Sequence, residues 1–125
     1  MVEIIFKELS YQINGLLYKI DNQLGYGHKE KVYDNALETL LKESNIPFER
    51  ELYLPTKIND KIIGRQYFDF LIDKKIILEI KTANYMYRES CSQLFSYLKG
   101  SGYKLGLIAR FTKNGVRIKR ILNIR

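Results

Sequence analysis

The sequence predicts an α/β domain in which helices pack on a central β-sheet of mixed strand direction. Before Asn45, apolar residues recur at three- and four-residue steps, which is typical of amphipathic helices. The pattern then changes to short apolar or alternating runs typical of strands, interrupted by one more helical segment. This order favours a sheet of mixed direction flanked by helices. Because the chain has 125 residues and no linker or repeat interrupts it, we expect a single domain over residues 1–125.

Three helices are expected. The first follows apolar positions from Leu9 to Leu24 and stops at Gly25, because glycine readily adopts the left-handed conformation that ends a helix. The second runs from about Lys29 to Ser44, and the third covers roughly Arg88–Lys99. The apolar side of the second helix is formed by Val32, Ala36, Leu37, Leu40 and Leu41.

The strands are predicted from β-rich runs separated by turn residues. Asn59-Asp60 and Asn114-Gly115 are the turn signals of two hairpins, and Asp73-Lys74-Lys75 is a polar turn between the two clearest strands. The expected segments are Phe48–Leu54, a hairpin over Lys57–Ile63, Gly64–Ile72, Ile76–Lys81, Leu105–Phe111 and Val116–Leu122.

Composition limits the setting of the protein. The chain has one cysteine, Cys91, so an internal disulfide is excluded, and no apolar run is long enough to cross a membrane. The first residues lack the pattern of a signal peptide. We therefore expect a cytoplasmic protein without a membrane partner.

The positive charge is concentrated at one end of the sequence. The formal net charge is +7, and no Asp or Glu follows Glu89, whereas eight Lys and Arg residues do. Removing those eight from the 21 in the chain leaves 13 beside 14 acidic residues. Such a distribution predicts a surface that meets a polyanion, although a solubilising surface without a partner gives the same pattern. The expected nucleic-acid contacts are Lys104, Arg110, Arg117, Lys119 and Arg120.

The hairpin around Asp73–Lys75 carries the candidate chemistry. If Ile72 pairs with Ile76, then Asp69 lies directly opposite Glu79, and Lys81 follows on the same face. The other face would be wholly apolar and covered by helices. Its residues would be Phe68, Phe70, Ile72, Ile76, Leu78 and Ile80.

Two opposed carboxylates are unfavourable unless they are solvated, protonated or bridged by a cation. Mg²⁺ prefers oxygen ligands and keeps several waters, which suits Asp69, Glu79 and a backbone carbonyl. Lys81 could then orient or deprotonate an attacking water, or stabilise charge on a phosphate. The alternative is a solvated sheet face on which Lys81 merely neutralises Glu79.

Three further segments share order and spacing with a known family. They are Gly27-His28-Lys29-Glu30-Lys31-Val32-Tyr33, Gly64–Asp69 ahead of Glu79-Ile80-Lys81, and Gln93–Leu98 ahead of Lys104–Ile108. Together these motifs, from about Leu9 to Ile121, resemble the GxxExxY protein family of the PD-(D/E)xK nuclease superfamily. The sequence departs from the family's pattern at Tyr26-Gly27, where relatives have Pro-Gly, and at Arg110-Phe111, where they have Asn-Phe.

The resemblance implies a restriction-endonuclease-like core and a set of site residues. It implies that Asp69 and Glu79 bind metal together with the backbone carbonyl of Ile80, and that Lys81 is the catalytic lysine. Glu30 matches the helix-borne acid and metal ligand of the superfamily, although an acid in a first helical turn is also favoured by the helix dipole. Gln93 matches a polar residue of the following helix.

The sequence as a whole thus predicts a Mg²⁺- or Mn²⁺-dependent nuclease acting on DNA, with RNA left open. Two other classes remain in view: a nucleic-acid-binding module of the same fold that does not cut, and a small protein-interaction domain. A homodimer would let so small a chain grip both strands of a duplex.

Overall fold

A computed structural model describes residues 4–82 and 87–123 of the chain. Five strands form one sheet in the order β1-β2-β3-β4-β5, in which β3 and β4 are parallel and the other neighbours antiparallel. The predicted sheet of mixed direction is therefore confirmed. The elements are α1 (Lys7–Leu24), α2 (Glu30–Glu43), β1 (Phe48–Ile58), β2 (Lys61–Ile72), β3 (Ile76–Lys81), α3 (Tyr87–Ser101), β4 (Leu105–Thr112) and β5 (Gly115–Leu122).

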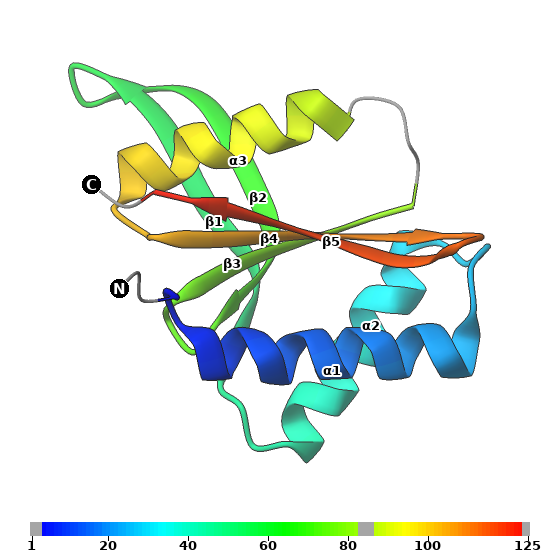
Figure 1. Cartoon of the computed structure of the whole chain (residues 1–125). Helices are drawn as coiled ribbons and strands as arrows, with labels where there is room; N and C mark the ends of the chain where they lie inside the picture. The colour runs from blue at the N-terminus through cyan, green and yellow to red at the C-terminus, as the bar shows by residue number, and fades with distance from the viewer. Residues whose placement is uncertain (1–3, 83–86, 124–125) are drawn as a thin grey trace.

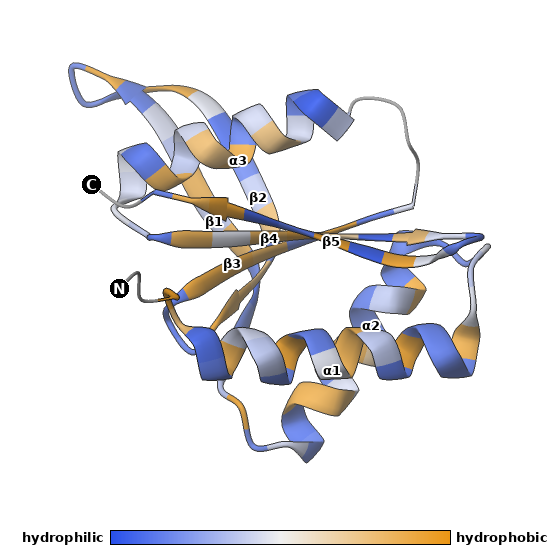
Figure 2. Cartoon of the chain, in the orientation of Figure 1, coloured by the Kyte–Doolittle hydropathy of each residue, from blue (hydrophilic) through white to orange (hydrophobic). Residues whose placement is uncertain are grey.

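The helices cover both faces of the sheet, with α3 on one face and α1 and α2 on the other (Figure 1). One apolar core lies between the sheet and α1 and α2, and a smaller one lies under α3 around Leu94 and Leu98. The middle of the sheet, along β3 and β4, is mainly hydrophobic (Figure 2). No helix of the described residues is both long and apolar enough to span a membrane.

The strands β1 and β2 are longer than the sequence suggested. The separate segments expected over residues 48–72 join into two continuous strands, which turn at Asn59-Asp60 as predicted. Both turn residues have positive φ, 51° and 64°, as a tight hairpin turn requires. Pro55 does not interrupt β1, because β1 is an edge strand and an edge residue can lack its amide donor.

The helices begin and end within a few residues of the predicted positions, and Ala36, Leu37, Leu40 and Leu41 of α2 face the core as predicted. Val32, expected in the core, is 40% exposed, whereas Tyr33 is fully buried. The Tyr33 ring stacks on Phe111 with a centroid distance of 4.0 Å, and its hydroxyl donates to the carbonyl of Gly25. Tyr33 thereby ties the loop between α1 and α2 to the end of β4.

Side chains of the β1–β2 hairpin change faces near Asp69. Phe70 belongs to the core under α1 and α2, whereas Phe68 belongs to the core under α3, so the expectation that both share one face is wrong. Opposite Asp69, Glu51 has a φ of 56°, and the pairing register skips both residues. A left-handed residue in a strand breaks the alternation of side chains. Asp69 therefore lies at an irregular point of β2.

The contact between α3 and β4 gives a test of this packing. A Cβ added to Gly106 would lie 2.7 Å from Leu94 Cδ2 and 2.9 Å from its Cγ, so Gly106→Ala should lower the free energy of unfolding by about 1–3 kcal/mol. Gly15, exposed in α1, has no atom within 4 Å of such a Cβ, and Gly15→Ala should raise that free energy by about 0.5–1 kcal/mol. Urea denaturation measures both, and equal stability of the two variants would contradict the described packing.

Candidate active site

The strands β2 and β3 part at Asp69 and Glu79. The predicted register is confirmed from Ile72–Ile76 to Phe70–Leu78, but the ladder ends there, so the two acids do not pair directly as expected. Instead each carboxylate accepts a hydrogen bond from the backbone of the other strand. The amide of Asp69 donates to Glu79 Oε1 at 2.9 Å, and the amide of Ile80 donates to Asp69 Oδ2 at 2.7 Å.

Burial favours the protonated form of both carboxylates. Burial, and after it the charge of Asp69, raise the pKa of Glu79 to about 8, even though Lys81 acts to lower it. The Lys81 Nζ atom lies 3.5 Å from Glu79 Oε2. The pKa of Asp69 is also raised by burial, while the hydrogen bond from Ile80 lowers it and Glu30 raises it. Ionisation of both carboxylates at once is therefore unfavourable in this structure.

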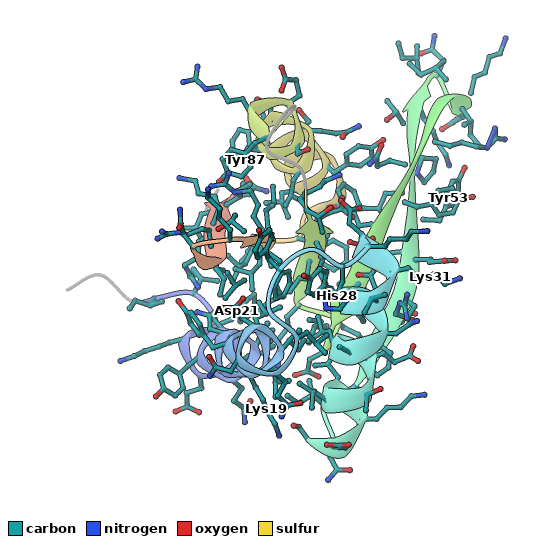
Figure 3. All side chains as sticks on the ribbon, turned by 90° about the vertical axis from the view of Figure 1, so that its right-hand side faces the viewer. Lys19, Asp21, His28, Lys31, Tyr53 and Tyr87 are labelled. Atoms are coloured by element: carbon teal, nitrogen blue, oxygen red, sulfur yellow. The ribbon has the colours of Figure 1, made fainter. Side chains whose placement is uncertain are left out.

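Glu30, the first residue of α2, reaches the end of β3. Its Oε2 accepts a hydrogen bond from the backbone amide of Thr82 at 3.1 Å. Figure 3 looks onto this end of the molecule, where the loop that carries His28 lies across from the N-terminal end of α3 at Tyr87. The chain thus brings the predicted helix-borne acid next to the residue after Lys81.

Asp34 is an acid of this centre that the sequence analysis missed. It follows Glu30 by one helical turn, so both lie on the same side of α2. Its exposed fraction is 8%, and its Oδ1 atom is buried without a hydrogen-bond partner among the described residues. Burial, and after it the charge of Asp69, raise its pKa to about 7, even though Arg50 acts to lower it. The spacing from Glu30 was the signal in the sequence that could have identified it.

Gln93 lies on α3 and is exposed. Its Nε2 atom donates to Oε1 of Gln66 in β2 at 2.7 Å. Within the described residues, this hydrogen bond directs the amide to the β1–β2 hairpin, and no hydrogen bond joins it to the carboxylates of the centre.

The five basic residues predicted to meet nucleic acid do not form one surface. Arg110 is next to Lys81 in the β3–β4 register, and Arg117 is next to Arg110 in the β4–β5 register. Lys104 directly precedes Leu105, the first residue of β4, and so lies at the opposite end of this strand from Arg110. The Arg120 guanidinium instead donates to Ser10 Oγ (2.9 Å) and to the carbonyl of Ile5 (3.1 Å), on the face covered by α1. Because Arg120 holds α1 to the sheet, we leave it out of the nucleic-acid surface.

The donor atoms fit a divalent cation that keeps much of its water. Asp69 and Glu79 each use one oxygen, Oδ2 and Oε1, for a backbone hydrogen bond. Asp69 Oδ1 and Glu79 Oε2, which lies 3.5 Å from Lys81 Nζ, are not used in these two bonds. Within residues 4–82 and 87–123, no three His, Cys, Asp or Glu side chains are arranged to hold a metal ion together. Mg²⁺ is commonly held by only one or two carboxylates and completes its shell with water and substrate phosphate.

Two solved structures share this fold. One, described as the crystal structure of SSO0001, superposes with a TM-score of 0.56 at 22% identity, over 94% of this chain and 57% of that one. The other is an alkaline exonuclease (LHK-Exo) from Laribacter hongkongensis, with a TM-score of 0.52 at 12% identity, over 98% of this chain and 72% of that one. The chain thus spans little more than half the length of the first. The predicted restriction-endonuclease-like fold is confirmed.

A comparison of the sequence with protein families identifies the superfamily. Residues 7–121 match the family model of the PD-(D/E)XK nuclease superfamily, and the chain belongs to this superfamily. No curated protein matches the sequence.

The electrostatic repulsion between the Asp69 and Glu79 carboxylates can be measured in the absence of metal. Asp69→Asn keeps an acceptor for the Ile80 amide and removes one charge, so in chelator at pH 9 it should be more stable than the wild type by about 0.5–1 kcal/mol. Acids whose pKa is raised in the folded state bind protons more tightly there. The contribution of these two acids to the stability of the wild type should therefore be largest below about pH 4.5 and be lost as the pH rises to about 8, so the advantage of the variant should shrink at pH 5.5.

Thermal melts in chelator at both pH values measure this difference. Glu49→Gln, a charge removal at an exposed position of β1, serves as the control and should not change the pH dependence. A destabilised Asp69→Asn at pH 9 would mean that Asp69 acts chiefly as a structural residue.

Proposed function

We propose that this chain is a metal-dependent nuclease that hydrolyses phosphodiester bonds of DNA, and that RNA is the second substrate to test. The observation that supports it best is the pair of carboxylates that accept hydrogen bonds from backbone amides of the opposite strand, Glu79 from Asp69 and Asp69 from Ile80, with the Lys81 ammonium 3.5 Å from Glu79. Membership in the nuclease superfamily supports the same reaction class.

In this proposal, Asp69 and Glu79 are the metal ligands, with the Ile80 carbonyl as a further ligand. The cation, Mg²⁺ or Mn²⁺, would supply a Lewis acid at the phosphate oxygens when bound. Lys81 would orient the attacking water or stabilise the charge that develops on the phosphoryl group. Glu30 would add negative charge beside the cation while its hydrogen bond to Thr82 holds the end of β3.

A binding module that does not cut is the second candidate, and the acids weigh against it. Glu79 is 8% exposed and its pKa is raised to about 8, so an ionised Glu79 costs folding stability at neutral pH. A protein that only binds a polyanion would gain from replacing such buried acids.

We further propose that the chain belongs to the GxxExxY branch of the superfamily, because it has Gly27, Glu30 and Tyr33 at the positions of that motif.

Cleavage should require metal and the site residues. With Mg²⁺ or Mn²⁺, the purified protein should cut labelled DNA, while Glu79→Gln and Lys81→Met should lower the rate by about 10²–10³-fold or more. The matched controls Glu49→Gln and Lys75→Met make the same chemical changes at exposed positions and should retain activity. Equal cleavage by all five proteins would reveal a contaminant and remove the catalytic proposal.

Metal binding has a readout that does not depend on cleavage. Ca²⁺ or Mg²⁺ should raise the melting temperature of the wild type, because a ligand that binds only the folded state stabilises it. Asp69→Asn should respond much less, since it has lost a charged ligand. If DNA and RNA substrates stay intact while the metal shift is present, the protein binds the cation without the proposed reaction.

A further inference from the structure

A row of three cations crosses the sheet at the end of β3. Lys81 pairs with Arg110 in the parallel β3–β4 register, and Arg110 pairs with Arg117 in the antiparallel β4–β5 register. Residues that pair across neighbouring strands point to the same face. The three side chains therefore share the face of Glu79, on the side of the sheet that carries α3, and the row begins at the proposed reaction centre.

Such a row is unfavourable in the protein alone. Like charges directly opposite one another on neighbouring strands are destabilising. Contacts within the protein reduce this repulsion; for example, Lys81 lies 3.5 Å from Glu79, and the Arg110 guanidinium lies 3.9 Å from the centre of the Tyr87 ring. Arg117 is exposed on the edge strand β5 and takes part in none of the ion pairs found among the described residues. An extended anion would relieve the repulsion that remains.

We propose that Lys81, Arg110 and Arg117 bind the phosphates of one nucleic-acid strand, which leaves the reaction centre by crossing β4 and then β5. This inference rests on the proposed nuclease function and adds the path of the substrate. Neighbouring strands lie about 4.8 Å apart, so the backbone positions of Lys81 and Arg117 are separated by roughly 10 Å. That length suits an extended backbone of several phosphates better than a single phosphate ion.

The surroundings of the row of cations indicate that it binds a single nucleic-acid strand. The next position on this face of β4 is Ile108, which is fully buried in the core under α3. The cationic row is therefore one residue wide until β5, where exposed Lys119 lies beside Arg117 on the same face. One line of cations has contacts for one backbone, and we expect single-stranded ends to bind along it.

The remaining basic residues supply a matched control. Lys104 is exposed and precedes the far end of β4, so Lys104→Gln removes the same charge as Arg117→Gln but lies off the proposed path. Both variants reduce the net charge of the protein equally, so a general electrostatic effect would weaken binding in both alike.

The experiment measures binding of a labelled single-stranded oligonucleotide by fluorescence anisotropy over a series of salt concentrations, with Ca²⁺ in place of Mg²⁺. Arg117→Gln should bind more weakly than the wild type at low salt, and the log–log slope of affinity against salt should fall by about 0.7. Arg117→Lys should keep most of the affinity, and Lys104→Gln should match the wild type. Arg110→Gln should resemble Arg117→Gln, with a thermal melt to confirm that the contact with Tyr87 is not needed for folding.

Equal losses in Arg117→Gln and Lys104→Gln, or no loss in either, would overturn the proposed path. This outcome differs from failure of the nuclease proposal. A protein that binds with the expected pattern but does not cut keeps the path and loses the reaction, whereas a protein that cuts with unchanged affinity in Arg117→Gln keeps the reaction and loses the path.

Discussion

The structure depends on the reciprocal hydrogen bonds that join Asp69 and Glu79 to the backbones of opposite strands. These bonds take the place of the ladder bonds that end at Phe70 and Leu78, so β2 and β3 can separate without leaving their amides unpaired at this point. They also hold two acids in positions that their own charges oppose. The apolar cores on both sides of the sheet keep the acids buried and supply the stability that this arrangement requires.

The acids of α2 extend this constraint beyond the hairpin. Glu30 and Asp34 both interact electrostatically with Asp69, and Arg50 lowers the pKa of Asp34 and of Asp69. The Arg50 guanidinium itself is held by Glu38 at 3.2 Å and lies over the ring of Phe70. The second helix thus contributes negative charge to the centre, and Arg50 of β1 partly compensates it.

Local patterns in the sequence predicted much of this arrangement, whereas features that depend on distant contacts were missed. Apolar periodicity located the helices, and the three-residue turn before Ile76 fixed the register of the two central strands. Strict alternation put Phe68 on the wrong face, because it assumes regular strands and cannot detect the left-handed conformation of Glu51. Arg120 resembled any other basic residue of its strand, since its partners Ser10 and Ile5 lie more than a hundred positions earlier in the sequence.

The parallel pairing of β3 with β4 has a consequence for how the protein assembles. The hairpin that carries Asp69 and Glu79 closes through the short turn at Asp73–Lys75, whereas β4 reaches β3 only after the chain has passed through the whole of α3. Closing a longer loop costs more entropy, and contacts distant in sequence slow folding. The acidic half of the centre is therefore available early in folding, and the cationic half only once the crossover docks. During synthesis, a chain that has been made only as far as the end of β3 contains the acids but not yet the cations of β4 and β5.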